Sequence, residues 1–337
     1  MKKFIFSMLL SSSFFAAFAQ PATSLYQTAR TYMMHGDFEN AAINYNTLLK
    51  QDPNNADALA DYCYLLVLQK DYAKAIELGK QLIASPKANV QVYQTLGLAY
   101  KGKAAYKEAE ALYKAGLVKF ASSGVLYNEY GELFAMQNKL SDAILQWETG
   151  IKADPNYSNN YYNATMYYSK VQIDLFWVIQ YGEIFINLDS YSAHTATIKV
   201  KLLDAYKKIL AGDQLDKLAA NPANSDFQKA WYQTISLSKS AVKNSIDAES
   251  LGALRTRFIL DWFYSKQNEK TPFHLFDNNQ YLVKEGFFDA YNQWIFGEAA
   301  SPEAYQGWAN THDKELNFFK AFQQNKIYRQ PAGEYYK

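Results

Sequence analysis

Apolar and small residues recur at helical spacing in the segment 124–155. They form two successive stripes, each on one face of a helix: Tyr127, Tyr130, Gly131 and Phe134, then Leu140, Ala143, Trp147 and Gly150. Pro155 ends the second stripe, because proline lacks the backbone N–H that a further turn requires. The segment therefore predicts an antiparallel pair of helices. Such a pair needs neighbours to cover its apolar seam.

The same pattern recurs every 34 residues towards the N-terminus, in units that begin at Ala22, Ala56, Val90 and Gly124. The second helix of each unit carries an alanine at the same place: Ala41, Ala75, Ala109 and Ala143. This spacing of large, small and proline positions resembles the tetratricopeptide repeat (TPR) family, whose unit is also 34 residues long. The resemblance implies an all-α fold, with a TPR solenoid of about four to five repeats over residues 20–190.

A fifth unit would begin at Ser158, but its second helix departs from the pattern. Trp177 stands where the other units have alanine. An indole at the seam predicts either a splayed pair of helices or a register that slips toward Gly182. Solenoids often end in an atypical unit of this kind.

Residues 191–337 predict a further helical module. Ser225 with Gln228 forms a capping-box pattern, and Ser301-Pro302-Glu303 is a start signal for a later helix. The last 88 residues hold 20 of the 55 aromatic side chains of the chain, so this part is aromatic-rich. We expect the module to cap the solenoid, with most of these rings in its core. The alternative is that a few of them, such as Tyr305 and Trp308, face a glycan.

The N-terminus predicts export. Lys2 and Lys3 precede a short apolar run, and Ala17-Phe18-Ala19 forms a cleavage site, so residues 1–19 are expected to be a signal peptide. The apolar run is shorter than the roughly 20 residues of a membrane span, and no transmembrane segment is expected in the mature chain. We therefore expect a periplasmic or secreted protein. Cleavage takes the net charge from +1 to −1, because it removes two lysines. A near-neutral chain gives no reason to expect nucleic acid as a partner.

The sequence contains none of the spaced motifs that catalysis or metal binding requires. H-E-x-x-H, C-x-x-C, G-x-S-x-G and glycine-rich phosphate loops are absent. His312 and Glu315 are three residues apart, but no paired histidines complete a metal site. We therefore predict no enzyme activity and no cofactor. An enzyme with its site in the C-terminal module is the less favoured alternative.

The functional prediction therefore depends on the solenoid. In the family, the first helix of each unit lines a concave groove, which implies these ligand-facing candidates: Tyr26, Arg30, Met33, Tyr64, Gln94, Leu98, Asn128, Glu132, Tyr162, Asn163 and Met166. The carboxylate clamp of the best-known subgroup is absent. An aromatic, amide-rich and nearly neutral groove favours a protein or peptide partner. The open alternative is a carbohydrate-binding or uptake accessory protein of the bacterial envelope.

Overall fold

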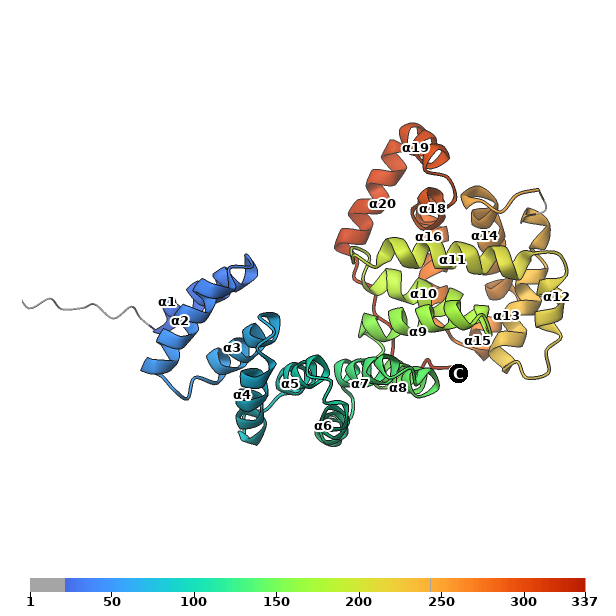
Figure 1. Ribbon diagram of the computed structural model, residues 1–337. Helices are drawn as coiled ribbons and strands as arrows, with labels where there is room; N and C mark the ends of the chain where they lie inside the picture. Colours follow the sequence, from blue (N-terminus) through green and yellow to red (C-terminus); the bar gives the residue numbers. More distant parts are fainter. Residues whose placement is uncertain (1–21, 243, 337) are drawn as a thin grey trace, which may run out of the picture. The chain divides into compact units, whose positions relative to one another are not determined.

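The computed structural model describes residues 22–242 and 244–336, and the regular structure in those residues is entirely helical (Figure 1). The expected signal peptide and its cleavage site lie outside the described residues. The chain divides into two compact units, Met1–Lys103 and Ala104–Lys337. Each unit has its own apolar core.

The described residues of the first unit form two helix pairs and one further helix. These are α1 (Ala22–Met34), α2 (Phe38–Gln51), α3 (Ala56–Leu68), α4 (Tyr72–Ala84) and α5 (Val90–Gly102). The first helices of the pairs begin where the 34-residue period predicts. The seam alanines Ala41 and Ala75 are fully buried. Cys63 lies against the second of them, and its thiol donates to the Ala75 carbonyl at 3.3 Å.

The second unit continues the repeats and then changes architecture. Its repeat helices are α6 (Tyr106–Lys119), α7 (Gly124–Met136), α8 (Leu140–Ala153), α9 (Ser158–Val171) and α10 (Leu175–Leu188). A long helix, α11 (Thr195–Leu210), packs on α10 and α9. The rest of the module comprises α12 (Gln214–Ala219), α13 (Asp226–Ser236), η1 (Lys239–Val242), α14 (Ala248–Tyr264), α15 (Gln267–Lys270), α16 (His274–Lys284), α17 (Phe288–Asn292), the π-helix η2 (Gln293–Gly297), α18 (Glu298–Ala300), α19 (Pro302–Thr311) and α20 (Asp313–Asn325).

The turn inside each helix pair has a residue with positive φ at the same place, fourteen positions after the repeat begins. The five residues are Gly36, Lys70, Ala104, Asn138 and Gln172, with φ between 55° and 77°. Glycine occupies this left-handed position only in the first repeat, and the other four repeats carry a side chain there.

The fifth pair differs from the others by one residue. Its second helix begins 17 positions after Ser158, whereas α2, α4, α6 and α8 begin 16 positions after their repeats start. The extra residue lies in the turn between Gln172 and Leu175. It moves Trp177 away from the seam position, so Trp177 is buried beside Tyr181, with ring centroids 4.9 Å apart. The register therefore slips, but by one residue.

Both predicted helix starts in the C-terminal module are present. Ser225 and Gln228 form a reciprocal capping box at α13. The Ser301 hydroxyl accepts from the Ala304 N–H at the start of α19, and Pro302 follows in the first turn. Local side-chain chemistry therefore sets both boundaries, as the sequence indicates.

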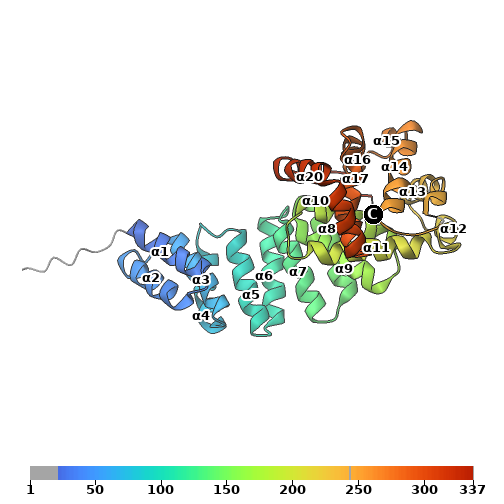
Figure 2. The same cartoon turned by 90° about the horizontal axis from the view of Figure 1, so that it is seen from above.

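The end of the repeats packs directly on the C-terminal module within the second unit (Figure 2). Phe176 of α10 meets Trp231 of α13 edge to face, with centroids 5.3 Å apart. Glu183 of α10 forms an ion pair with Arg255 of α14, and both side chains are at most 5% exposed. Near the C-terminus, the Asn156 amide donates to the Gln330 carbonyl at 3.0 Å.

Candidate functional site

In the first unit, Tyr26 and Arg30 converge on one internal carboxylate. The Tyr26 hydroxyl donates to Asp61 Oδ2 at 2.9 Å, and Arg30 Nε lies 3.5 Å from the same oxygen. Burial, and then the hydrogen bond to Asp61, raise the pKa of Tyr26 to about 12. The charge of Arg30 is thus balanced by a carboxylate of the same chain. A partner that needs a cation here would have to displace Asp61.

The other four candidates of the first unit are half-buried. Met33 packs against the core cluster of the first helix pair, while Tyr64 belongs to α3. Gln94 and Leu98 lie one turn apart on α5. Of these four residues, Met33, Tyr64 and Leu98 offer mainly apolar contact area.

In the second unit, the candidate amides form a chain of hydrogen bonds between α7 and α9. Asn163 Nδ2 donates to Asn128 Oδ1 at 2.8 Å, and Asn128 Nδ2 donates to Glu132 Oε1 at 3.0 Å. Trp147 Nε1 donates to the Asn128 carbonyl at 3.3 Å. The sequence interpretation placed Asn128 facing a ligand, but the side chain is 1% exposed. Asn128 therefore positions its neighbours, and Asn163 is the more accessible of the two.

A cavity with a volume of about 410 Å³ opens beside these residues; we call it the repeat cavity. Its lining residues come from α8, α9 and α11: Leu140, Trp147, Asn163, Met166, Tyr167, Ser169, Lys170 and Lys201. The structure thus brings the candidates Asn163 and Met166 together at one depression. Tyr162 does not line it, because its ring stacks on His194, with centroids 4.3 Å apart.

Sequence reasoning missed part of this lining. Tyr167 follows Asn163 by four residues on α9, and Lys170 follows Met166 by four, a helical spacing that could have indicated both. Lys201 comes from α11, which follows the last repeat, and no repeat position points to it. Trp147 was assigned to the seam, and it does pack there. Its indole would clash with any side chain at Gly131.

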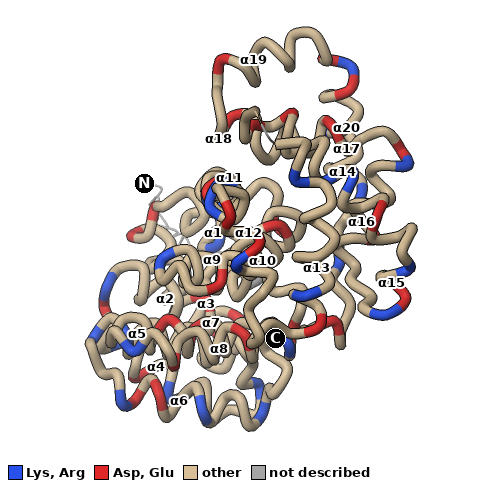
Figure 3. The backbone as a smooth tube through the Cα atoms, turned by 90° about the vertical axis from the view of Figure 1, so that its right-hand side faces the viewer, with Lys and Arg blue, Asp and Glu red and all other residues tan. Residues whose placement is uncertain are grey.

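The charge around the repeat cavity is one-sided, although Figure 3 shows acidic and basic residues interspersed along the backbone. Lys170 and Lys201 are the charged residues that line it, and no carboxylate does so among the described residues. The floor is apolar, formed by Leu140, Trp147 and Met166. This combination fits an apolar side chain with a negative group close by.

The described residues contain neither a cluster of metal-ligating side chains nor a helix long and apolar enough to span a membrane. Residues 22–242 and 244–336 contain no group of three His, Cys, Asp or Glu side chains placed to hold a metal ion. In the same residues, no helix has the length and apolar character that a membrane span needs. Burial raises the pKa of the Cys63 thiol to about 12, so this cysteine is protonated at neutral pH.

Two of the aromatic residues that sequence reasoning offered as a glycan-facing alternative lie in a stack on α19. The rings of Tyr305 and Trp308 are 6.4 Å apart, and Trp308 stacks on His312 at 4.8 Å. His312 is the N-cap residue of α20, at the junction with α19, and Glu315 lies in the first turn of α20.

Comparisons with known proteins identify the repeat. Residues 26–89 match the family model described as tetratricopeptide repeat. No curated protein matches the sequence. Proteins with this repeat typically serve as scaffolds for protein interactions, and they are generally not enzymes.

Solved structures with a similar arrangement include a thermophilic TPR protein of Thermus thermophilus, at 15% identity and a TM-score of 0.45, covering 55% of this chain and 99% of that one. A tetratricopeptide repeat protein of Parabacteroides merdae has 20% identity and a TM-score of 0.46, and the match covers 56% of this chain and 72% of that one. The structure of pilF of Pseudomonas aeruginosa has 17% identity and a TM-score of 0.46, and the match covers 64% of this chain and 96% of that one. The family match over residues 26–89, together with the 34-residue period and the helix pairs, shows that the chain contains tetratricopeptide repeats.

Proposed function

We propose that this protein is an exported, non-enzymatic scaffold that binds a short segment of a partner protein at the repeat cavity. The observation that carries the proposal is the cavity itself, which has a volume of about 410 Å³ and an apolar floor. This volume lies within the range of about 300–1,000 Å³ that is typical of ligand pockets. Export rests on the N-terminal pattern of Lys2, Lys3 and the site after Ala19.

The lining favours a particular kind of segment. Met166 has a flexible, polarisable side chain that adapts to different apolar partners. Lys170 and Lys201 then favour an acidic residue next to the apolar anchor. Asn163 supplies an amide that is already oriented by Asn128, so less side-chain entropy is lost when it bonds a peptide backbone. The segment we propose therefore has a bulky apolar residue flanked by aspartate or glutamate.

The test starts with site-specific photo-crosslinking in intact cells. A photoreactive amino acid at Met166 should crosslink to one partner, whereas the same group at Ile173, which is 78% exposed in the α9–α10 turn, should not. Peptides covering the crosslinked segment are then titrated against the purified protein. Met166→Ala should weaken binding about tenfold, as expected for loss of a buried anchor worth about 1–2 kcal/mol.

The second measurement tests whether charge contributes to peptide binding. Lys170→Ala should weaken binding of the acidic peptide and reduce its salt dependence, while a peptide with amides in place of the carboxylates should not respond to that substitution. Equal crosslinking at positions 166 and 173 would contradict the proposal. So would peptide binding that is unchanged in both variants. Mass spectrometry of the protein from the envelope fraction should show Gln20 as the first residue; an intact Met1 would contradict export.

A further inference from the structure

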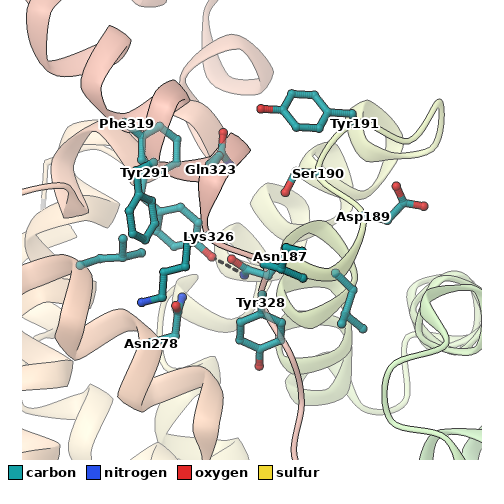
Figure 4. A pocket seen from close by; sticks show the side chains of 14 residues that line it. Asn187, Asp189, Ser190, Tyr191, Asn278, Tyr291, Phe319, Gln323, Lys326 and Tyr328 are labelled. Atoms are coloured by element: carbon teal, nitrogen blue, oxygen red, sulfur yellow. Dashed lines mark hydrogen bonds between the residues drawn. The ribbon is translucent and has the colours of Figure 1, made fainter.

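A second cavity, which we call the module cavity, lies where the end of the repeats meets the C-terminal helices (Figure 4). Its volume is about 190 Å³. One wall is the connection from α10 to α11, which contributes Ser190 and Tyr191. The opposite wall is formed by α16, α20 and the segment after α20. All of these elements belong to the second unit.

Aromatic rings form much of the lining. Phe319 and Tyr291 are buried side by side, with centroids 5.9 Å apart. Tyr191 extends from the other wall and is 68% exposed (Figure 4). Phe322, on the same wall as Phe319, is only half-buried, so a ligand in this cavity would contact ring surfaces from both walls.

Amide side chains line the cavity between these rings. Asn187 Nδ2 donates to Tyr291 Oη at 2.7 Å and to the Glu183 carbonyl at 2.7 Å, so both its N–H groups are used and its Oδ1 remains an acceptor. Asn278 and Gln323 also line the cavity, and each carries both donors and an acceptor. A ligand whose polar groups both donate and accept hydrogen bonds fits these amide side chains.

The charges that line the module cavity cancel. Asp189 and Lys326 are the charged lining residues among those described. Lys326 Nζ lies 3.4 Å from the centroid of the Tyr281 ring and 5.2 Å from that of Phe322, so aromatic faces already stabilise its charge. Neither sign is in excess. The site therefore gives no electrostatic advantage to an anion or a cation.

We infer that the module cavity binds one pyranose unit of a neutral saccharide. Sugar hydroxyls donate and accept hydrogen bonds, as the amides of Asn278 and Gln323 do. The C–H faces of a pyranose pack on aromatic rings such as Tyr191 and Phe322. The cavity is smaller than the roughly 300 Å³ at which drug-sized pockets begin, and it holds about six water volumes, which suits a single ring. Tyr191 and Ile327, 68% and 73% exposed, leave the mouth open for the rest of a chain.

Saturation-transfer NMR on the full-length protein tests this inference. The probes are glucose, galactose, mannose and N-acetylglucosamine, with glucuronate as the charged counterpart. At least one neutral sugar should give a saturable signal, and a disaccharide of that sugar should compete with it. Gln323→Ala and Asn278→Ala should each weaken binding about five- to tenfold, as expected for loss of one hydrogen bond. Tyr191→Ala should do the same.

The matched control is Tyr264→Ala, because Tyr264 is 91% exposed and does not line the module cavity. Its circular dichroism and sugar binding should equal those of the parent, and Tyr191→Ala should also retain the parent spectrum. The inference fails if no neutral sugar gives a saturable signal, if glucuronate binds as well as the neutral sugars, or if Tyr191→Ala and Tyr264→Ala behave alike. Since Met166→Ala leaves the module cavity unchanged, sugar binding should persist in that variant whether or not the repeat cavity binds a peptide.

Discussion

At the scale of single residues, the left-handed turn position is the clearest source of local strain. Ala104 adopts φ +55° there, a conformation that costs a residue with a Cβ atom about 1–2 kcal/mol. Glycine relieves this cost, but it also increases the entropy of the unfolded chain by an amount worth about 0.4–1 kcal/mol. Ala104→Gly should therefore raise the free energy of unfolding by about 0.5–1 kcal/mol in urea titration.

A matched control for this prediction lies elsewhere on the surface. Ala211 is exposed and has φ −68°, so a glycine there relieves no strain. Ala211→Gly should lower the free energy of unfolding by about 0.4–1 kcal/mol, through the unfolded state alone. Shifts of the same sign in both variants would show that the turn position is not strained.

Lys199 gives the second prediction at this scale, because its ammonium group is packed against protein. Nζ lies 3.8 Å from the centroid of the Trp294 ring, and burial lowers the pKa of this lysine to about 8. The unfolded chain holds the proton up to a pKa near about 10.4, so between about pH 8 and 10 it binds more protons than the folded state. This group alone therefore makes the protein more stable as pH rises through that window.

Lys199→Met tests the pH effect, since methionine keeps the aliphatic stem without the charge. The difference in free energy of unfolding between parent and variant should be constant below about pH 7 and should shift in favour of the parent from about pH 8 to 10. Differences between the two proteins cancel the titration of the other lysines and tyrosines. A difference that stays flat over the whole range would mean that the pKa of Lys199 is not lowered.

At the scale of helices and turns, the extra residue in the fifth repeat places Val178, and not Trp177, at the seam. Val178 stands three residues after the start of α10, where the other repeats carry alanine, and it is 1% exposed. A bulkier side chain there would overpack the seam, which costs about 1–3 kcal/mol. Val178→Trp should therefore lower the melting temperature measured by circular dichroism. Ile173→Ser changes a side chain that is 78% exposed and should leave the melting temperature unchanged, and equal melting of the two variants would contradict this account.

The repeat helices show how much of the fold the sequence could predict. The starts of α3, α5, α7 and α9 follow from the period alone, because each repeat places its small, large and turn residues at the same positions. The sequence could not predict that the shift of α10 is one residue. Trp177 signals that the regular register is impossible, but only the surrounding rings of Phe176, Tyr181 and Phe227 select the alternative.

The candidate sites were less predictable, for a physical reason. Met166 could be found because a repeat position projects it from a first helix, and Asn163 because it stands next to such a position. The remaining contributors come from segments far apart in the sequence. Lys201 reaches the repeat cavity from α11, and Tyr191 and Gln323 meet at the module cavity although they are far apart in the chain. No local sequence pattern indicates that these residues are close in space, since their proximity depends on how whole helices pack.

At the scale of the whole molecule, one buried ion pair links the repeats to the module. The Glu183 carboxylate accepts from Arg255, from Asn279 Nδ2 at 2.9 Å and from the Tyr291 hydroxyl at 3.1 Å. Arg255→Met leaves this carboxylate buried without its partner. Loss of one member of a buried pair costs about 3–5 kcal/mol. The free energy of unfolding should fall by that amount.

A double-mutant cycle separates the pair from simple burial. Glu183→Leu with Arg255→Met should recover most of the lost stability, because two apolar residues need no compensation. Lys114→Met removes a partner from the exposed pair Lys114–Glu110 and should change the free energy of unfolding by less than about 0.5 kcal/mol. If the double variant loses the sum of the two single losses, the two charges are not coupled.

The same junction decides whether the C-terminal module is needed for a stable repeat domain. Helix α10 buries apolar side chains on both sides, among them Phe176, Trp177 and Ile184, and the module covers part of this surface through Phe227 and Trp231. A fragment Gln20–Ser190 would expose that face to water, and an uncovered patch of this kind promotes association. We expect the fragment to aggregate, or to melt well below the full-length protein, when both are compared by light scattering and calorimetry.

The fragment Gln20–Ser190 carrying polar replacements at Phe176 and Ile184 is the control, because it should be more soluble if the exposed face is the cause. A truncated protein that is monomeric and as stable as the parent would instead make the module an independent domain, whose ligand would have to be sought separately from that of the repeats.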